Sequence, residues 1–406
     1  MTPRPELAGT FAMSKASWVM FFVVALLVVA LGHAYIWWRL VRQPAWPAPW
    51  QTVGTILVVA LGLLMVVALP LSRALPRAWA TPLAALAYTW MGMGFLLTVA
   101  FLFVDFFRLV STAASALWAA LGSKVPTEPD PGRRLLLVQG ANGAAALVAA
   151  SAGGIGLRGG LGEVGIKEVP VRLERLPKEL SGLTIVQLTD VHVGPLIGKR
   201  FVDQIVEKTN ALRPDVVAIT GDLVDGSVRE LFEHVAPLAR LRARYGVYFV
   251  TGNHEYYSGV EDWIEQLRRM GIRVLRNERV TIGDAASFDL AGIDDAFSHR
   301  YGRGHGPDLD RALAGRDPER ELVLLAHQPS AVHDAARLGV GLQLSGHTHG
   351  GQIWPFGMLV PLAQPYVAGL HRHGDFTQIY VSQGTGFWGP PMRLGAPAEI
   401  TKVVLI

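Results

Sequence analysis

The 406-residue sequence contains no cysteine. Disulfide bonds, a thiolate nucleophile and a cysteine-based zinc site are therefore excluded. Any metal ion bound by this chain has to be held by imidazole, carboxylate and amide groups.

Charge is also scarce. Only 17% of the residues are charged, the formal net charge is +4, and no long run of lysine and arginine occurs. A basic stripe or patch is the usual footprint of a nucleic-acid-binding protein. We therefore do not expect nucleic acid as a partner.

Hydrophobic residues make up half of the chain, and their surplus lies before residue 160. A bilayer core is crossed by a helix of about 20 apolar residues. Stretches of this kind occur at residues 17–37, 51–71, 81–110 and 135–157. Segments this long with so few charges rarely form the core of a soluble protein, so we expect a transmembrane region over residues 1–160. A separate folded domain is then expected over residues 161–406.

Tryptophan, lysine and arginine residues beside the spans indicate how this region is oriented in the membrane. Tryptophans between the first two spans are typical of an interfacial belt, and a greater number of cations after spans one and three than elsewhere favours a cytoplasmic side for those loops. The tryptophans are Trp37, Trp38, Trp46 and Trp50; the cations of the first set are Arg39, Arg42, Arg108, Lys124, Arg133 and Arg134, and those of the second are Arg4, Lys15, Arg73 and Arg77. This balance predicts a multi-pass protein of the bacterial cytoplasmic membrane with its C-terminal domain on the extracytoplasmic side.

Two features of the apolar region have alternative interpretations. Arg133 and Arg134 precede an alanine-rich run and fit either a positive-inside anchor or a twin-arginine export signal. Asp105 lies near the end of the third span, three residues before Arg108, and fits either an interfacial ion pair or a proton or ion pathway.

From about residue 168, short apolar runs alternate with segments of helical periodicity. Buried strands are predicted at residues 184–188, 216–220, 248–250, 322–326 and 342–344, and helices at 201–212, 231–244 and 260–270. Strands that alternate with helices predict an α/β fold.

Polar side chains follow each of these five strands. They are Asp190 and His192, Asp222 and Asp225, Asn253 and His254, His327, and His347 and His349. In α/β sheets, ligands bind at the carboxyl ends of the strands. This mixture of carboxylate, imidazole and amide donors suits Mn, Fe, Zn or Co, and two such ions can clamp a phosphoryl group if one carboxylate bridges them. Asp222 is our candidate for the bridge.

These blocks resemble the calcineurin-like metallophosphoesterase superfamily, with its Asp-x-His, Gly-Asp-x-x-Asp, Gly-Asn-His-Glu, His and Gly-His-x-His motifs, from residue 183 to the end. The runs at 346–353 and 384–393 resemble a narrower group, the bacterial membrane-associated YkuE-type enzymes. The resemblance implies a four-layer α/β/β/α sandwich. It also implies two divalent metal ions, manganese among the candidates, and attack on phosphorus by a metal-bridging hydroxide.

The resemblance also implies the role of each residue. The first metal is expected to take Asp190, His192, Asp222 and His349, and the second Asp222, Asn253, His327 and His347. His254 is expected to contact the phosphate and assist the leaving group. Asp225 is expected to orient His254, although it also fits a loop-capping residue before Gly226.

The expected function is a membrane-anchored phosphoesterase that cleaves phosphodiester or pyrophosphate bonds of a phospholipid-like or envelope substrate. The alternative is a metal-binding membrane sensor or scaffold whose catalysis is vestigial. Retention of both Asn253 and His254 favours the enzyme, because decayed sites usually lose a ligand or this pair.

Other polar and aromatic residues were weighed for this site. Five histidines are interpreted as surface or rim residues: His299, His305, His333, His371 and His373. Tyr256 and Tyr257 fit either a cleft wall or packing at a helix start, and Phe387 and Trp388 fit either an apolar lip or core packing. The glycines at 159 and 160 are interpreted as a linker.

Overall fold

The computed structural model describes residues 15–121, 130–302 and 304–406. The chain forms two compact units, one comprising residues 15–158 with Gly389–Met392, and the other mainly residues 159–388 and 393–406. Two of the cations counted above, Arg4 and Lys124, lie outside the described residues.

The first unit consists of long helices. They are α1 (Lys15–Trp37), a π-helical turn η1 (Trp38–Arg42), α2 (Ala48–Ala74), α3 (Arg77–Ala120) and α4 (Pro131–Leu161). The four α-helices are long and apolar enough to cross a membrane, as expected, and their bounds extend beyond the predicted spans at most ends.

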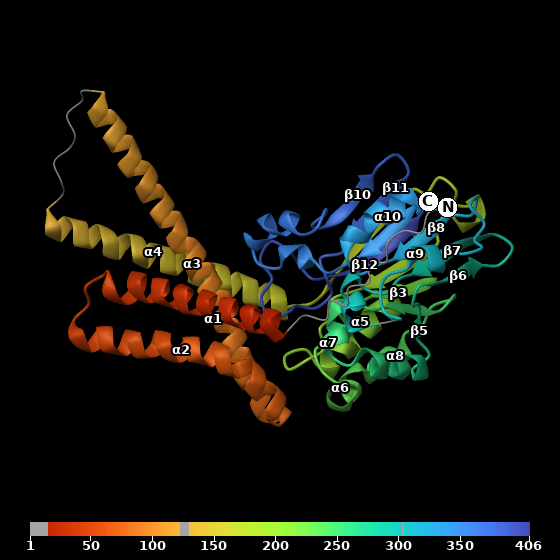
Figure 1. Cartoon of the computed structure of the whole chain (residues 1–406), viewed down its shortest axis with the longest axis horizontal. Coiled ribbons are helices and arrows are strands. Elements are labelled where there is room, and N and C mark those ends of the chain that lie inside the picture. Colours follow the sequence, from red (N-terminus) through yellow and green to blue (C-terminus); the bar gives the residue numbers. More distant parts are fainter. Residues whose placement is uncertain (1–14, 122–129, 303) are drawn as a thin grey trace. The chain divides into compact units, whose positions relative to one another are not determined.

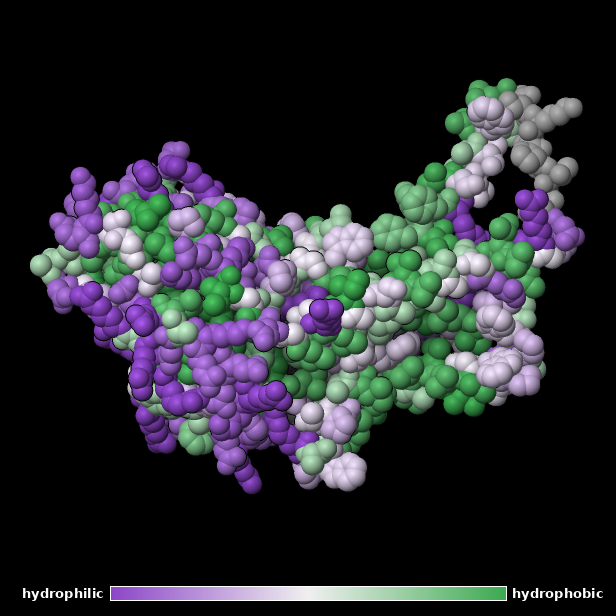
Figure 2. Space-filling view, turned by 180° about the vertical axis from the view of Figure 1, so that it is seen from behind, coloured by the Kyte–Doolittle hydropathy of each residue, from purple (hydrophilic) through white to green (hydrophobic). Residues whose placement is uncertain are grey.

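Large apolar side chains on these helices point away from the rest of the chain. Leu31, Ile56 and Phe107 are 69%, 62% and 65% exposed, and Figure 2 shows hydrophobic residues over much of the visible face of the helices. A soluble protein rarely exposes so continuous an apolar surface. The four helices therefore suggest association with a membrane.

A polar network links the helices at one level. Arg39 Nη1 donates to Asp105 Oδ1 over 2.5 Å, and the hydroxyl of Tyr35 donates to Asp105 Oδ2. The expected ion pair of Asp105 thus forms with Arg39, which is 66 residues away in the sequence, and no bond from Arg108 is formed among the described residues. Pairing of this kind is how a charge is accommodated in an apolar helical region.

The second unit contains two six-stranded sheets. The first sheet has the order β1 (Gly165–Val171), β12 (Glu399–Leu405), β2 (Thr184–Leu188), β3 (Val216–Thr220), β4 (Val247–Val250) and β5 (Arg273–Val274). The second has the order β10 (Gly369–His373), β11 (Thr377–Val381), β9 (Leu342–Ser345), β8 (Leu322–Leu325), β7 (Ser287–Gly292) and β6 (Glu278–Gly283).

Helices cover the outer faces of both sheets. The helices of this unit are α5 (Lys199–Ala211), α6 (Val228–Val235), α7 (Asn253–Tyr257), α8 (Val260–Arg269), α9 (Leu309–Ala312) and α10 (Val332–Arg337). Its short 3-10 turns are η2 (Lys178–Leu180), η3 (Ala236–Arg240), η4 (Ala296–Tyr301), η5 (Pro329–Ala331), η6 (His349–Gly351), η7 (Phe356–Met358) and η8 (Val360–Leu362). Helices α5, α6 and α8 share a core with the first sheet, and α9 and α10 share one with the second. Figure 1 shows these elements in sequence colours.

The main core lies between the sheets, where residues of β2 and β3 pack with residues of β8 and β9. The predicted four-layer α/β/β/α sandwich is therefore confirmed. One helix prediction was wrong: residues 231–244 do not form a single helix, because α6 ends at Val235 and a 3-10 turn containing Pro237 follows. Proline lacks the N–H that would continue the helix.

Candidate metal centre

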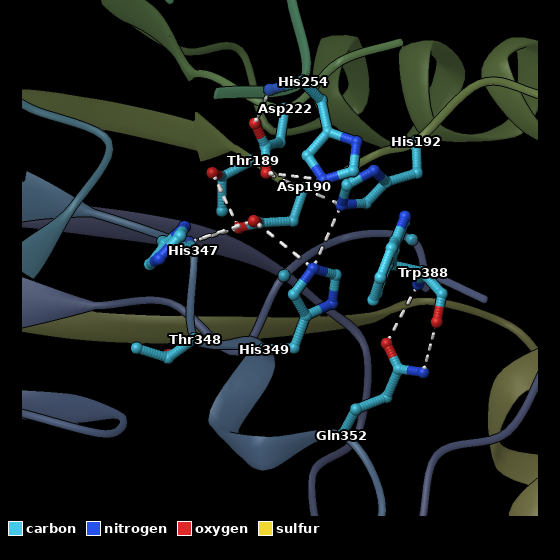
Figure 3. A network of polar contacts seen from close by, with 12 residues as sticks. Thr189, Asp190, His192, Asp222, His254, His347, Thr348, His349, Gln352 and Trp388 are labelled. Atoms are coloured by element: carbon cyan, nitrogen blue, oxygen red, sulfur yellow. Dashed lines mark hydrogen bonds and ion pairs between the residues drawn. The ribbon is translucent and has the colours of Figure 1, made fainter. Parts of the chain in front are cut away.

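The predicted polar residues meet at one end of the paired sheets. Strands β2, β3 and β4 are parallel neighbours, as are β8 and β9, so the carboxyl ends of each group lie at a common edge. Asp190 and His192 follow β2, and Asp222 follows β3. Figure 3 shows these side chains pointing toward His347 and His349, which follow β9.

The chain itself ties these strand ends together. The side chain of Gln187 donates to Thr220 Oγ1 and to the carbonyl of Ser345, which bridges the two sheets. The backbone N–H of His347 donates to the carboxylate of Asp190. Ligand positions are therefore held by hydrogen bonds that do not depend on a bound ion.

Among the described residues, three groups of side chains have the composition and spacing of metal sites, with the ligand atoms of each within 4.8 Å of one another. One of them consists of His192, Asp225 and His254. The other two are Asp190 with His192 and His349, and Asp222 with His327 and His347. Imidazole nitrogens face each other across each of these two groups, at 3.1 Å between His192 and His349 and 3.2 Å between His327 and His347. Facing lone pairs of this kind fit a cation between them.

Asp222 lies between the two groups. Its Oδ2 atom is 3.1 Å from His327 Nε2 and 3.9 Å from His192 Nε2, while Oδ1 accepts the backbone N–H of His254. Burial would raise the pKa of Asp222, but His327 and His254 hold it well below the usual value. A buried, ionised carboxylate in contact with both groups has the geometry of a bridge.

Asn253 and His327 fit a metal on one side of this bridge. The Oδ1 atom of Asn253 is buried and has no hydrogen-bond partner among the residues that the structure describes. Such an orphaned acceptor is costly unless a cation or another donor satisfies it. His327 Nδ1 is 2.8 Å from the carbonyl of Thr220, which fixes its tautomer and directs Nε2 toward Asp222. The donor set thus fits two divalent ions.

The backbone at these positions is strained. Five of the side chains belong to residues with positive φ, a region that non-glycine residues rarely adopt: Asp190 (52°), His192 (53°), Asp222 (50°), His347 (71°) and His349 (52°). Each such residue costs about 1–3 kcal/mol and persists only where the surroundings enforce it. Their clustering at one site points to a functional constraint.

Asp225 contacts two imidazoles rather than one. Its Oδ1 is 2.5 Å from His254 Nδ1 and 3.2 Å from His192 Nδ1. Burial disfavours the charged form of His254, yet Asp222 and the hydrogen bond to Asp225 raise its pKa to about 9. The contact with Asp225 thus uses Nδ1 of His254, while Nε2 lies 3.9 Å from Asp222 Oδ2.

Glu255, for which the sequence predicted no role, accepts hydrogen bonds from the backbone around Asp222. Its two carboxylate oxygens accept the backbone N–H groups of Asp222, Leu223, Val224 and Gly252 over 2.7–3.3 Å. Glu255 is 1% exposed. It therefore joins the loop after β3 to the loop after β4, and its place in the Gly-Asn-His-Glu block was the available signal.

Arg393 was also missed as a site residue. It is 3% exposed and donates to the carbonyls of Gln383, Gly386 and Ala396, while Nη2 lies 3.3 Å from His349 Nδ1. Burial, His192 and Arg393 together hold the pKa of His349 well below its usual value. Arg393 is the only charged residue between Asp375 and Glu399, and a single cation in so long an uncharged segment was the available indication of a special role.

The two aromatic pairs with alternative interpretations, Tyr256 with Tyr257 and Phe387 with Trp388, each contain one buried and one exposed residue. Tyr256 and Phe387 are buried, whereas Tyr257 and Trp388 are 46% and 53% exposed. The rings of Tyr257 and Trp388 lie 5.4 and 5.6 Å from the ring of His254. Each pair thus contributes one core residue and one residue at the mouth of the site.

The discounted histidines lie outside the two metal groups. His299 is exposed, His305 contacts Arg276, His333 contacts His373, and His371 stacks on Tyr366.

The close approach of Gly252 to Asp222 leads to a first prediction. A Cβ on Gly252 would lie 2.2 Å from Asp222 Oδ1 and 2.5 Å from its backbone nitrogen. Gly252→Ala is therefore expected to displace Asp222 and to weaken metal binding by at least about tenfold. Metal titration followed by elemental analysis measures this, with Gly143→Ala as the control, because a Cβ there meets no atom within 4 Å. Equal affinity in both variants would contradict the prediction.

A second prediction concerns Glu255. Glu255→Ala would leave four buried N–H groups without their acceptor, at a cost of about 1–3 kcal/mol for an unsatisfied buried group. The melting temperature of the α/β unit in the full chain is expected to fall by about 5–10 °C, and bound metal is expected to fall with it. Glu319→Ala, an exposed glutamate of the same unit, is the control. A melting curve identical to that of the control would be evidence against this role.

Comparison with known proteins agrees with the geometry. The calcineurin-like phosphoesterase family matches residues 183–351. An uncharacterised metallophosphoesterase of Helicobacter pylori is 44% identical over 248 residues, which cover 61% of this chain and 65% of that protein. A transmembrane protein with metallophosphoesterase domain from Bos taurus is 45% identical over 249 residues, 59% of this chain and 56% of that protein.

A third relative corresponds to the narrower group. The uncharacterised metallophosphoesterase YkuE of Bacillus subtilis is 31% identical over 249 residues, which cover 59% of this chain and 84% of that protein. The match to the Helicobacter and Bos proteins thus spans about two thirds of their length or less.

Proposed function

The chain belongs to the calcineurin-like phosphoesterase family, and from this membership we propose that it is a membrane-anchored hydrolase of phosphate esters with two divalent metal ions. The observation that carries the proposal is the position of Asp222 between two buried groups of metal-binding side chains. A purely structural metal site has no need of a shared carboxylate beside a hydrogen-bonded Asp–His pair.

The proposed ligands are those named from the sequence. One ion would be held by Asp190, His192, Asp222 and His349, and the other by Asp222, Asn253, His327 and His347. When bound, two such ions supply Lewis acidity toward the phosphoryl oxygens and lower the pKa of water. The strained loops, the hydrogen bonds donated by Gln187 and by the His347 N–H, and those accepted by Glu255 hold the ligands in place before an ion arrives.

His254 and Asp225 have a separate role in the proposal. The Nδ1–H of His254 donates to Asp225 Oδ1 over 2.5 Å, which leaves Nε2 as the atom that meets the substrate. Nε2 of His254 gives its proton to the leaving oxygen as the bond between that oxygen and phosphorus breaks. Asp225 also fixes the ring of His192, so that one carboxylate positions a proton donor and a metal ligand.

We propose a phosphodiester or pyrophosphate bond of a lipid-like or envelope molecule as the substrate. The support is the joining of the site to four apolar helices in one chain. The proposed location is the bacterial cytoplasmic membrane, with the catalytic unit on the extracytoplasmic side, as the distribution of arginine and lysine favours.

Hydrolysis by the full chain, purified in detergent and stripped of metal, tests the proposal. Bis-p-nitrophenyl phosphate and p-nitrophenyl phosphate are assayed with Mn, Zn, Mg, Fe or Co, or without metal. We expect diester cleavage that requires added metal and saturates at two ions per chain. Two bound ions without turnover of any ester would favour the sensor alternative.

A further inference from the structure

An exposed apolar surface follows the last metal-binding loop. It consists of Trp354, Phe356, Met358, Leu359, Leu362 and Trp388, which we call the apolar rim. Leu362 is 85% and Met358 73% exposed, more than any other large hydrophobic side chain in the described part of the α/β unit. Such exposure is costly in water unless something covers it.

The rim lies in a part of the chain without charge. No Asp, Glu, Lys or Arg occurs from residue 338 to residue 371, although 17% of the whole chain is charged. Surface loops of soluble domains normally carry charged residues, which keep them in water. The composition of this segment instead resembles that of a surface that contacts an apolar phase.

The rim is continuous with the proposed catalytic site. The side chain of Gln352 donates to the carbonyl of Trp388 and accepts its backbone N–H, both over 2.9 Å, and Figure 3 shows this pair beside His349. The ring of Trp388 is 5.6 Å from the ring of His254. Trp388 is thus the member of the rim that lies beside His254.

Chain continuity indicates what covers the rim. Helix α4 ends at Leu161 and β1 begins at Gly165, so the two ends are at most about 14 Å apart along an extended chain. The α/β unit is thus joined through a three-residue segment to α4, a helix long and apolar enough to cross a membrane.

We propose that the apolar rim inserts into the surface of the lipid bilayer and that the substrate is a phosphate ester of a membrane lipid, which reaches His254 along Trp388. Tryptophan at the headgroup level and Met and Leu deeper are the usual order of an interfacial surface. The substrate part of this proposal rests on the proposed phosphoesterase function, whereas insertion of the rim does not.

Insertion is tested on the full chain in vesicles of phosphatidylethanolamine and phosphatidylglycerol. Because the chain has no cysteine, Leu362→Cys gives a single site for an environment-sensitive fluorophore, and Glu319→Cys, an exposed polar position, is the matched control. We expect a blue-shifted emission at position 362 that a lipid with a quencher on its acyl chain reduces at least about twofold, and no change at position 319. Equal quenching at the two positions overturns the proposal, as does an emission shift that follows protein density and ignores the lipid quencher, since that would mean a second copy covers the rim.

The substrate is tested with two diesters that share a leaving group. Hexadecyl p-nitrophenyl phosphate partitions into the vesicles, and ethyl p-nitrophenyl phosphate stays in water. In the Leu359→Ser/Leu362→Ser variant, we expect the ratio of hexadecyl to ethyl turnover to fall about tenfold. Phe232→Ser is the control, because it also replaces an exposed hydrophobic side chain (41% exposed) by serine, but on α6, outside the rim. It should leave the ratio unchanged. An unchanged ratio in the double variant overturns the lipid route. No hydrolysis of either ester by the wild-type chain, with quenching intact, overturns the phosphoesterase function and leaves insertion standing.

Discussion

Replacing Asp222 by asparagine is expected to lower kcat/KM for bis-p-nitrophenyl phosphate by at least about 10³-fold. The physical reason is the position of its Oδ2 atom, which lies within 4 Å of a histidine of each metal group. Asparagine keeps the shape and the acceptor for the His254 N–H but removes the negative charge that two cations would share. Without that charge, mutual repulsion should expel one ion.

Two measurements on the same samples check this expectation. Elemental analysis should find about two metal ions per wild-type chain and at most one in Asp222→Asn, and the loss of turnover should persist at saturating metal. Asp284→Asn is the matched control, because the side chain of Asp284 is 81% exposed and lies on a hairpin away from the site. Two ions and wild-type turnover in Asp222→Asn would refute the assignment of the bridge.

The strands that carry the site could be predicted because each is marked by a pattern within a few consecutive residues. Residues 216–220 begin with four apolar residues and residues 184–188 contain three, as strands buried on both faces favour, and a short polar block follows each. The bounds of β2 and β3 coincide with the prediction. Since parallel strands place their carboxyl ends at one edge, the order of the blocks was sufficient to predict that they meet.

Strands β1 and β12 were not predicted, because they depend on distant partners. β1 pairs with β12, so that residues 165–171 lie beside residues 399–405, and β12 is antiparallel to β2. Only two of the seven residues of β1 are buried, so its apolar signal is weak. Their pairing is a property of the folded chain.

Residue roles that depend on a second partner were missed for the same reason. The sequence paired Asp225 with His254, which the 2.5 Å contact supports, but nothing in it indicated that His192 approaches the same oxygen. Asp105 likewise has its partner in Arg39, on another helix. Sequence motifs predict which residues are candidate metal ligands, whereas the contacts that hold those residues in place depend on the tertiary structure.

Replacing His254 by alanine is expected to reduce turnover in a way that depends on the leaving group. If the Nε2 proton passes to the departing oxygen, a poor leaving group should lose the full contribution of general acid catalysis, about 10²–10⁴-fold. Diphenyl phosphate is therefore expected to suffer a much larger loss than bis-p-nitrophenyl phosphate, whose leaving group departs readily without a proton. Metal content should stay at about two ions per chain, because His254 is not among the proposed ligands.

The hydrogen-bond pattern around Asp225 makes this expectation sharper. Asp225→Asn should repeat the leaving-group dependence of His254→Ala, since the amide oxygen that then faces Nδ1 lacks the negative charge that favours the protonated imidazole. It should also weaken metal binding by about 10–100-fold, because the same oxygen positions His192. His299→Ala, at an exposed histidine outside the site, should change neither quantity. If His254→Ala reduced both esters equally, His254 would be stabilising charge on the phosphoryl group instead of donating a proton, and the two variants together would separate these roles.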